Sequence, residues 1–389
     1  MAACAFARLT YEFNRLLWQA DSNGAIDLRQ RYEEVSAWFL GQPVYGEIPT
    51  AVYPPASYLM LRPFLHYASF ADVRYLWAIT TVVALGSLIL AAIWISLADR
   101  PSEYAVLALL VVAIYATGPS IGNGQLTIHI LAALVVGLLL LLKPTQSLGT
   151  DLAGSSLIVF TLIKPTLTVP FIWLFVFALQ RLRPLFLILL GYSAIALFAC
   201  TFQAGSVWTL YHQWLKQGMG GAVWSSAGGG GLGRVDIGYA NIHNYLGALK
   251  LSQFNLSASL ALLLILGIWI QLHRQADVWI LVGVAAIMAR LWTYHLVYDD
   301  MLVLLPMIAL FRLQKQGLLE TKAQAFNETL LITTIFMNLL PASLRLANSP
   351  LDSIFTAGVT LDWMLLMGWL AWQAAQQKTQ RLFIPHSTQ

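Results

Sequence analysis

Two charged side chains lie in a mostly apolar sequence where each could take part in chemistry. Asp27 stands in the segment Gly24–Tyr32, close to a helix expected to begin near Leu28. Taken alone, Asp27 is an ordinary N-cap for that helix, and a single carboxylate does not establish a chemical role. Lys164 lies between two apolar runs and precedes Pro165. A lysine at mid-membrane depth costs about 2.5 to 3.5 kcal/mol, so Lys164 either binds an anion such as phosphate or extends its amine to the outer interface.

Neutral polar side chains form a second candidate. Asn123 and Gln125 lie in the glycine-flanked segment Gly118–Gln125, which is rich in helix breakers. The segment is either a plain turn or a source of hydrogen bonds to a sugar or phosphate.

A third group follows later in the chain. Arg290 lies within an apolar run, and His295, Tyr298, Asp299 and Asp300 follow it. The two acids either mark a hydrated helix end or bind a ligand. Neighbours on a helix point about 100° apart, so they do not suit one shared metal site. We expect no metal site and no cofactor, although a divalent cation is compatible with the sequence.

The composition indicates where these residues work. Of the 389 residues, 58% are hydrophobic and 10% are charged, against about 25% charged in a soluble protein. The mean hydropathy is +0.69. These values exclude a soluble multidomain enzyme and a disordered chain. A net charge of +4 is too dilute for nucleic-acid binding, and Cys4 and Cys200 are too far apart to suggest a disulfide framework or a metal motif.

The apolar runs predict an all-α bundle of membrane-spanning helices. Leu76–Ala98 is charge-free and long enough to span a bilayer. Tyr104–Leu142 is too long for one span, so it must fold back at Gly118–Gln125. Leu152–Gln180 is interrupted at Lys164. About 11 spans result at roughly 20 residues each when six further runs are included: Pro184–Phe202, Leu256–Leu272, Val278–Thr293, Met301–Phe311, Thr329–Leu344 and Ile354–Ala375.

Basic residues in short loops predict the orientation, because such loops face the cytoplasm. They are Arg100, Lys143, Arg181, Arg183, His273, Arg274, Arg312, Lys315, Lys322, Lys378 and Arg381. The outer side then receives Lys164, the turn with Gln125, Asp299, and a long loop over residues 203–255. That loop holds several tryptophans and the run Gly228–Gly231, which suit either an interfacial aromatic belt or a lid over a substrate.

The first 75 residues form the most polar part of the chain. Met1–Ala20 does not resemble a signal peptide. It predicts a helix with an apolar stripe that excludes Arg8 and Arg15, and such a helix suits the membrane interface. A second helix over Ala56–Phe70 is expected to lie along the membrane. The expected organisation is an outer segment over residues 1–75 and a transmembrane bundle over residues 76–389.

Several short motifs occur in one order along the chain. They are Asp27 with Tyr32, Gly41 to Tyr45, Tyr53-Pro54-Pro55, Gly124-Gln125, Lys164-Pro165, and Tyr298-Asp299 followed by Leu304-Leu305-Pro306. Together they make the chain resemble glycosyltransferase family 87 of the GT-C superfamily, the membrane enzymes that use polyprenyl-phosphate sugars. The resemblance covers most of the chain.

The resemblance implies a fold, a reaction and a set of roles. The fold would be a GT-C-like helix bundle with interfacial jaw helices before it. The enzyme would move a mannose- or arabinofuranose-like sugar from a polyprenyl-phosphate donor to a lipid or glycan acceptor, with inversion, on the outer face of the cell (inner) membrane. Asp27 would be the general base, and Lys164 would stabilise the departing phosphate. The substrate-binding residues would be Tyr53, Asn123, Gln125, Arg290, His295, Tyr298 and Asp299. One departure is that the family has a transmembrane helix before the base, and Met1–Ala20 does not read as one.

Two other classes fit parts of the pattern. A secondary transporter or lipid flippase would also hold intramembrane charges and broken helices, but its repeats should supply matched pairs of them. The sequence shows one broken helix, at Lys164-Pro165. A non-catalytic membrane scaffold would not account for Lys164 or Arg290.

Overall fold

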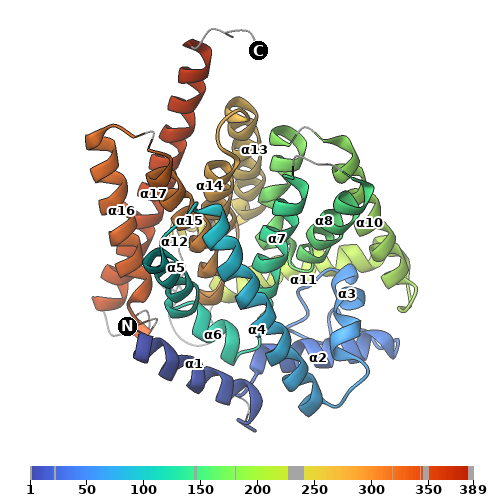
Figure 1. The fold of residues 1–389 in the computed structure, drawn as a ribbon. Helices are drawn as coiled ribbons and strands as arrows, with labels where there is room; N and C mark the ends of the chain where they lie inside the picture. The colour runs from blue at the N-terminus through green and yellow to red at the C-terminus, as the bar shows by residue number, and fades with distance from the viewer. Residues whose placement is uncertain are drawn as a thin grey trace. The chain divides into compact units, whose positions relative to one another are not determined.

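The computed structural model describes residues 2–21, 23–143, 147–179, 181–226, 241–317, 319–341, 343–344 and 350–383 (Figure 1). Throughout these ranges the regular elements are helices, and no strand occurs among them. The all-α prediction is therefore confirmed. The run Gly228–Gly231, proposed above as part of a lid, lies outside the described residues.

The chain divides into two compact units. Unit 1 comprises Met1–Ala91, Val111–Thr168 and Leu182–Asp236, and unit 2 comprises Ala92–Leu110, Val169–Arg181 and Ile237–Gln389. Each is described separately.

Unit 1 contains the N-terminal helices and the apolar helix pair α7 and α8. Its helices are α1 (Ala2–Leu17), α2 (Ile26–Phe39), α3 (Pro55–Leu65), α6 (Thr117–Gly122), α7 (Thr127–Leu141), α8 (Leu148–Thr161), α9 (Pro165–Thr168), α10 (Leu182–Cys200), α11 (Val207–Ser226) and most of α4 (Phe70–Ile95). Helix α8 packs between α7 and α10, while α3 packs on α10 and α1 lies along α6 (Figure 1).

The α7–α8 contact brings two backbones close together. A Cβ at Gly137 would lie 3.2 Å from the Gly154 carbonyl oxygen, and a Cβ at Gly154 would lie 2.7 Å from the Leu141 side chain. Small residues let apolar helices approach in this way. The close contact at Gly137 and Gly154 sets the position of α8. It therefore also positions the helix break that follows α8 at Lys164.

Aromatic packing attaches α2 and α3 to α10. The Trp38 indole stacks on Tyr58 with 4.6 Å between ring centroids. The Trp38 indole N–H also donates to the Ala199 carbonyl at 3.0 Å. Both aromatic side chains are fully buried. Helix α2, which carries Asp27, is therefore part of the core of unit 1.

Unit 2 surrounds one buried helix. It contains η1 (Val169–Phe171), η2 (Leu174–Ala178), α12 (Ile242–Ala248), η3 (Ser252–Phe254), α13 (Asn255–His273), α14 (Val278–Leu291), η4 (Val297–Val303), α15 (Leu304–Gln316), α16 (Thr321–Leu339) and α17 (Leu351–Phe383), with the end of α4 and most of α5 (Pro101–Ala113). Every residue from Trp279 to Leu291 of α14 is buried, and α15, α17 and α13 pack around this helix.

Basic loop residues of unit 2 are paired with acids at one end of its helices. The Lys315 amine contacts Asp99 at 2.5 Å and Glu103 at 2.8 Å. Arg312 contacts Asp277 at 2.6 Å. These loops therefore share one end of the unit, as the prediction from basic residues requires, while the side of the membrane they face stays a prediction.

Within the described residues, four helices are long and apolar enough to cross a membrane, namely Phe70–Ile95, Leu182–Cys200, Ser252–His273 and Leu351–Gln377. The bent pair Leu148–Thr161 and Pro165–Ala178, with 120° between its parts, makes a fifth if it counts as one span. The remaining apolar helices α5, α7 and α14 are shorter. These findings support a membrane protein, and the number of about 11 spans is not confirmed.

Three local expectations differ from the structure. The predicted loop over residues 203–255 contains the helices α11 and α12. The sequence of α11 mixes tryptophans with glutamines and a lysine, so it is too polar to be identified as a membrane-spanning helix. The first span begins at Phe70 and includes Arg74, because that arginine binds backbone carbonyls at Arg15 and Gln19. The second N-terminal helix correspondingly ends at Leu65.

Candidate active site

Asp27 lies in the first turn of α2. The N-cap is Ala25, in the left-handed region at φ 51°, and it makes no side-chain capping bond. The backbone N–H groups of Asp27 and Leu28 instead donate to the Asn123 carbonyl at 3.0 and 3.1 Å. The capping interpretation of Asp27 is therefore wrong. The Asn123 carbonyl satisfies the helix start, which leaves the Asp27 carboxylate available for other contacts.

The Asp27 carboxylate lies in a partly buried polar cluster. It is hydrogen-bonded to the side chains of Gln125 and Asn123, and the positive charges of Arg31 and Lys164 act on it. Burial raises the pKa of Asp27 above its usual value although all four neighbours act to lower it. A carboxylate with a raised pKa and some remaining exposure holds an accepted proton more firmly than a surface carboxylate does.

A tight turn supplies the two amide side chains of this cluster. Gly124 has φ +70°, and a Cβ there would lie 2.6 Å from the Leu28 Cβ. Glycine is required on both counts. The Gln125 N–H closes the turn on the Ser120 carbonyl at 2.8 Å. The turn expected over Gly118–Gln125 is thus present, with the short helix α6 inside it.

Lys164 lies at the break between α8 and α9, as the sequence predicts. The Ser57 hydroxyl of α3 donates to the Ile163 carbonyl at 2.7 Å, which joins the break to the N-terminal helices. Lys164 is half-buried. The structure therefore brings Asp27, Asn123, Gln125 and Lys164 together from three separate stretches of unit 1.

Two further charged residues extend the site along α2, and the sequence reasoning missed both. Arg31 lies one turn beyond Asp27, 2.6 Å from Glu34 Oε1 and 2.8 Å from the Thr50 carbonyl. Its guanidinium stacks 4.4 Å from the centroid of the Tyr53 ring, which is how Tyr53 connects to the cluster. The spacing of Asp27, Arg31 and Glu34 places them on one helix face, and this pattern could have identified the pair.

Glu34 is fully buried in this second part of the cluster. Its Oε1 accepts a hydrogen bond from the Thr50 hydroxyl at 2.8 Å. Burial raises the pKa of Glu34 to about 7, against the opposing effects of Arg31 and the Thr50 hydrogen bond. Glu34 is therefore a buried carboxyl that changes charge near neutral pH.

The predicted residues of the later group all lie in unit 2. Arg290 forms a buried ion pair with Asp300, and its guanidinium lies 5.1 Å from the Trp363 ring centroid. His295 Nδ1 lies 3.0 Å from Asp299 Oδ2. Tyr298 is buried in η4.

Asp299 and Asp300 are buried, so their interpretation as a hydrated helix end is wrong. Asp299 and Asp300 face different partners, in agreement with the expected divergence of helix neighbours. Among the residues that the structure describes, no three His, Cys, Asp or Glu side chains are grouped to hold a metal ion.

The chain matches no protein-family model, no curated protein and no solved structure.

Proposed function

We propose that the chain is a membrane glycosyltransferase of the GT-C type. It transfers a mannose- or arabinofuranose-like sugar from a polyprenyl-phosphate donor to a hydroxyl group of a lipid or glycan acceptor, on the outer face of the cell membrane. The observation that supports this most is the cluster of Asp27 with Lys164, Gln125 and Asn123. It combines a proton acceptor of raised pKa with a cation and neutral hydrogen-bonding groups.

The proposed reaction is a single displacement. The Asp27 carboxylate takes the proton of the acceptor hydroxyl while its oxygen attacks the anomeric carbon. The bond between that carbon and the phosphate oxygen breaks, and the phosphate leaves with the electron pair. The Lys164 amine stabilises the negative charge that develops on the phosphate. Attack opposite the leaving group inverts the anomeric configuration.

The amide side chains serve to hold the base. Gln125 and Asn123 bind the charged form of Asp27, and burial opposes that charge. The balance keeps the carboxylate ionised enough to act and basic enough to accept a proton. The roles of Arg290, His295, Tyr298 and Asp299 in substrate binding belong to the same proposal.

The N-terminal helices would be the interfacial part of this enzyme. The aromatic residues Phe6 and Tyr11 of α1, and Trp18 directly after it, are exposed. Aromatic side chains of this kind favour the membrane–water interface. The bundle of about 11 spans would follow, with the active site on the outer face.

The second candidate is a transporter or flippase, which is favoured by the 120° break beside Lys164. Purified protein in liposomes containing a radiolabelled polyprenyl-phosphate sugar and a lipid-linked acceptor separates the two. The proposal predicts a labelled glycoconjugate and unglycosylated polyprenyl phosphate. Movement of intact donor between leaflets without a new glycosidic bond would support the transporter instead.

A further inference from the structure

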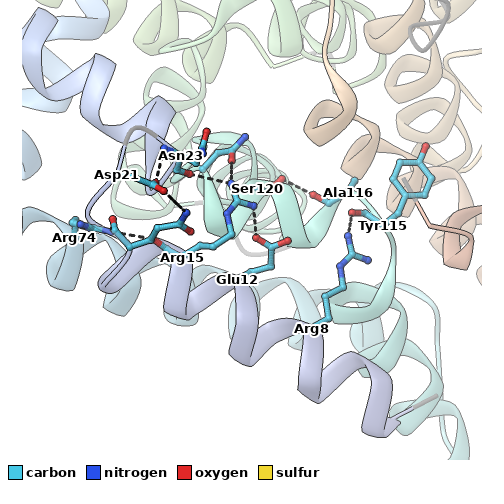
Figure 2. Close-up of polar contacts among 11 residues, drawn as sticks. Arg8, Glu12, Arg15, Asp21, Asn23, Arg74, Tyr115, Ala116 and Ser120 are labelled. Carbon is cyan, nitrogen blue, oxygen red and sulfur yellow. Dashed lines mark hydrogen bonds and ion pairs between the residues drawn. The ribbon is translucent and has the colours of Figure 1, made fainter. Parts of the chain in front are cut away.

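Helix α1 turns its charged side chains toward the protein. Arg8, Glu12 and Arg15 all point to α6 and the turn that follows it (Figure 2). Arg8 binds the carbonyl groups of Ile114 and Tyr115. The sequence predicted that the two arginines avoid the apolar stripe, and the structure shows that they are used for internal contacts.

Arg15 contacts a residue of the candidate active site. Its Nη2 donates to the Asn123 Oδ1 at 2.6 Å. When the amide oxygen accepts this bond, the amide nitrogen is left as the donor. The Asn123 side chain is also hydrogen-bonded to Asp27. Arg15 therefore selects the orientation of the amide in which Asn123 donates to the carboxylate.

Arg15 is itself held from two sides. Its Nη1 binds Glu12 Oε2 at 2.7 Å. Arg74, at the start of α4, donates to the Arg15 carbonyl at 2.9 Å and to the Gln19 carbonyl at 2.7 Å (Figure 2). These contacts fix both the guanidinium and the backbone of Arg15. The side chain that binds Asn123 is therefore held in place.

We propose that Arg15, oriented by Glu12, is a positioning residue that acts through Asn123 to hold the Asp27 carboxylate in its charged, proton-accepting form. This inference rests on the proposed function, in which Asp27 is the general base. Asn123 transmits the effect because an amide polarised by a cation is a stronger donor.

The direction of the effect follows from the groups around Asp27. Four groups act on the Asp27 carboxylate: Arg31 of the same helix, Lys164 at the α8–α9 break, and Gln125 and Asn123 in the turn. Arg15 is connected to it through Asn123, and Glu12 binds Arg15. Loss of Arg15 weakens a hydrogen bond to the charged form, which raises the pKa of Asp27. The shift should be about 0.5 to 1 pH unit, smaller than the roughly 1 to 3 units caused by direct contact with an arginine.

Two measurements on the full chain in liposomes test the inference. The first is the pH dependence of sugar transfer, whose acid limb should move upward by about 0.5 to 1 unit in Arg15→Met. The second does not depend on activity. A hydrophobic carbodiimide reacts with protonated carboxyl groups, and mass spectrometry of the Asp27 peptide gives the pH of half-maximal labelling. This pH should rise by the same amount.

Arg8→Met is the matched control, because Arg8 lies on the same helix face but binds backbone carbonyls instead of Asn123. It should leave both pH values unchanged. Arg15→Lys keeps a cationic donor and should bring both pH values most of the way back to those of the wild type. Asn123→Ala should show the same upward shift as Arg15→Met and takes its place if Arg15→Met does not fold.

The outcomes separate this inference from the proposed function. Unchanged labelling and transfer profiles in folded Arg15→Met and Asn123→Ala would overturn the positioning role, even if Asp27→Asn is inactive. A shifted labelling profile in a protein whose Asp27→Asn variant still transfers sugar would support the contact network and refute Asp27 as the base.

Discussion

The buried carboxyl of Glu34 predicts that the stability of unit 1 falls as the pH rises from mildly acidic to neutral. Its pKa moves from the usual 4.5 to about 7 because of burial. Between these values the folded protein keeps a proton that the unfolded chain releases. The stability that Glu34 contributes is therefore fully present below about pH 4.5 and declines until the folded carboxyl has ionised.

The magnitude follows from the shift. At about 1.4 kcal/mol per pH unit, a rise from 4.5 to about 7 gives a total loss of about 3 kcal/mol. For a cooperative unit of this size, 1 kcal/mol corresponds to about 2 to 4 °C in the midpoint of thermal unfolding. Glu34→Gln removes the titrating group. Its absolute stability will fall because the buried Arg31 loses its ion-pair partner, so the slope with pH is the informative quantity.

The assay is thermal unfolding of the protein in detergent, followed by tryptophan fluorescence from pH 4.5 to pH 8. The wild type should lose about 6 to 12 °C more over this window than Glu34→Gln. Glu47→Gln is the control, because Glu47 is an exposed acid of unit 1, and it should follow the wild type. Parallel curves for wild type and Glu34→Gln would refute the assignment of a proton to buried Glu34.

Three further predictions concern the scaffold. Gly124→Ala should reduce sugar transfer at least tenfold while the helix content stays unchanged on circular dichroism, because the residue has φ +70° and its Cβ would meet Leu28 at 2.6 Å; transfer at the wild-type rate would show that the turn does not set the site. Arg290→Met should cost about 3 to 5 kcal/mol by leaving Asp300 buried without its ion-pair partner. The double variant with Asp300→Asn should recover much of that loss in thermal unfolding, and equal losses in the single and double variants would contradict the pairing. Trp38→Phe should lower stability by about 1 to 3 kcal/mol, because the hydrogen bond from the buried indole to the Ala199 carbonyl is lost; an unchanged melting temperature would count against that hydrogen bond.

The sequence was informative where local chemistry decides the structure. Proline at position 165 breaks the helix after Lys164, and glycine at position 124 permits the left-handed turn that carries Gln125. Scarcity of charge also drew attention to Asp27 and Lys164. In an apolar chain, charged residues that are not in short loops need polar partners, and the structure places these two in one cluster.

Long-range contacts explain what the sequence did not predict. Taken alone, Asp27 predicts a helix cap. The carbonyl of Asn123, distant in sequence, accepts the N–H groups at the helix start instead. Arg15 was expected to face away from the apolar side of its helix, but nothing in its neighbourhood in sequence indicates that it binds Asn123. The spacing of Arg31 and Glu34 after Asp27 was a local signal that remained unused.

Asp27 is the general base of the proposed reaction, and its loss is the most direct test of that reaction. The decisive measurement is the initial rate of sugar transfer from a radiolabelled polyprenyl-phosphate donor in liposomes, for the wild type, Asp27→Asn and Asp21→Asn. Asp21 is an exposed acid in the same N-terminal stretch and serves as the control. Asp27→Asn should lose at least a hundredfold in rate, in line with the roughly 10² to 10⁴-fold contribution of general base catalysis, while Asp21→Asn should keep the wild-type rate. Transfer at the wild-type rate by a correctly folded Asp27→Asn would contradict the role of Asp27 as general base.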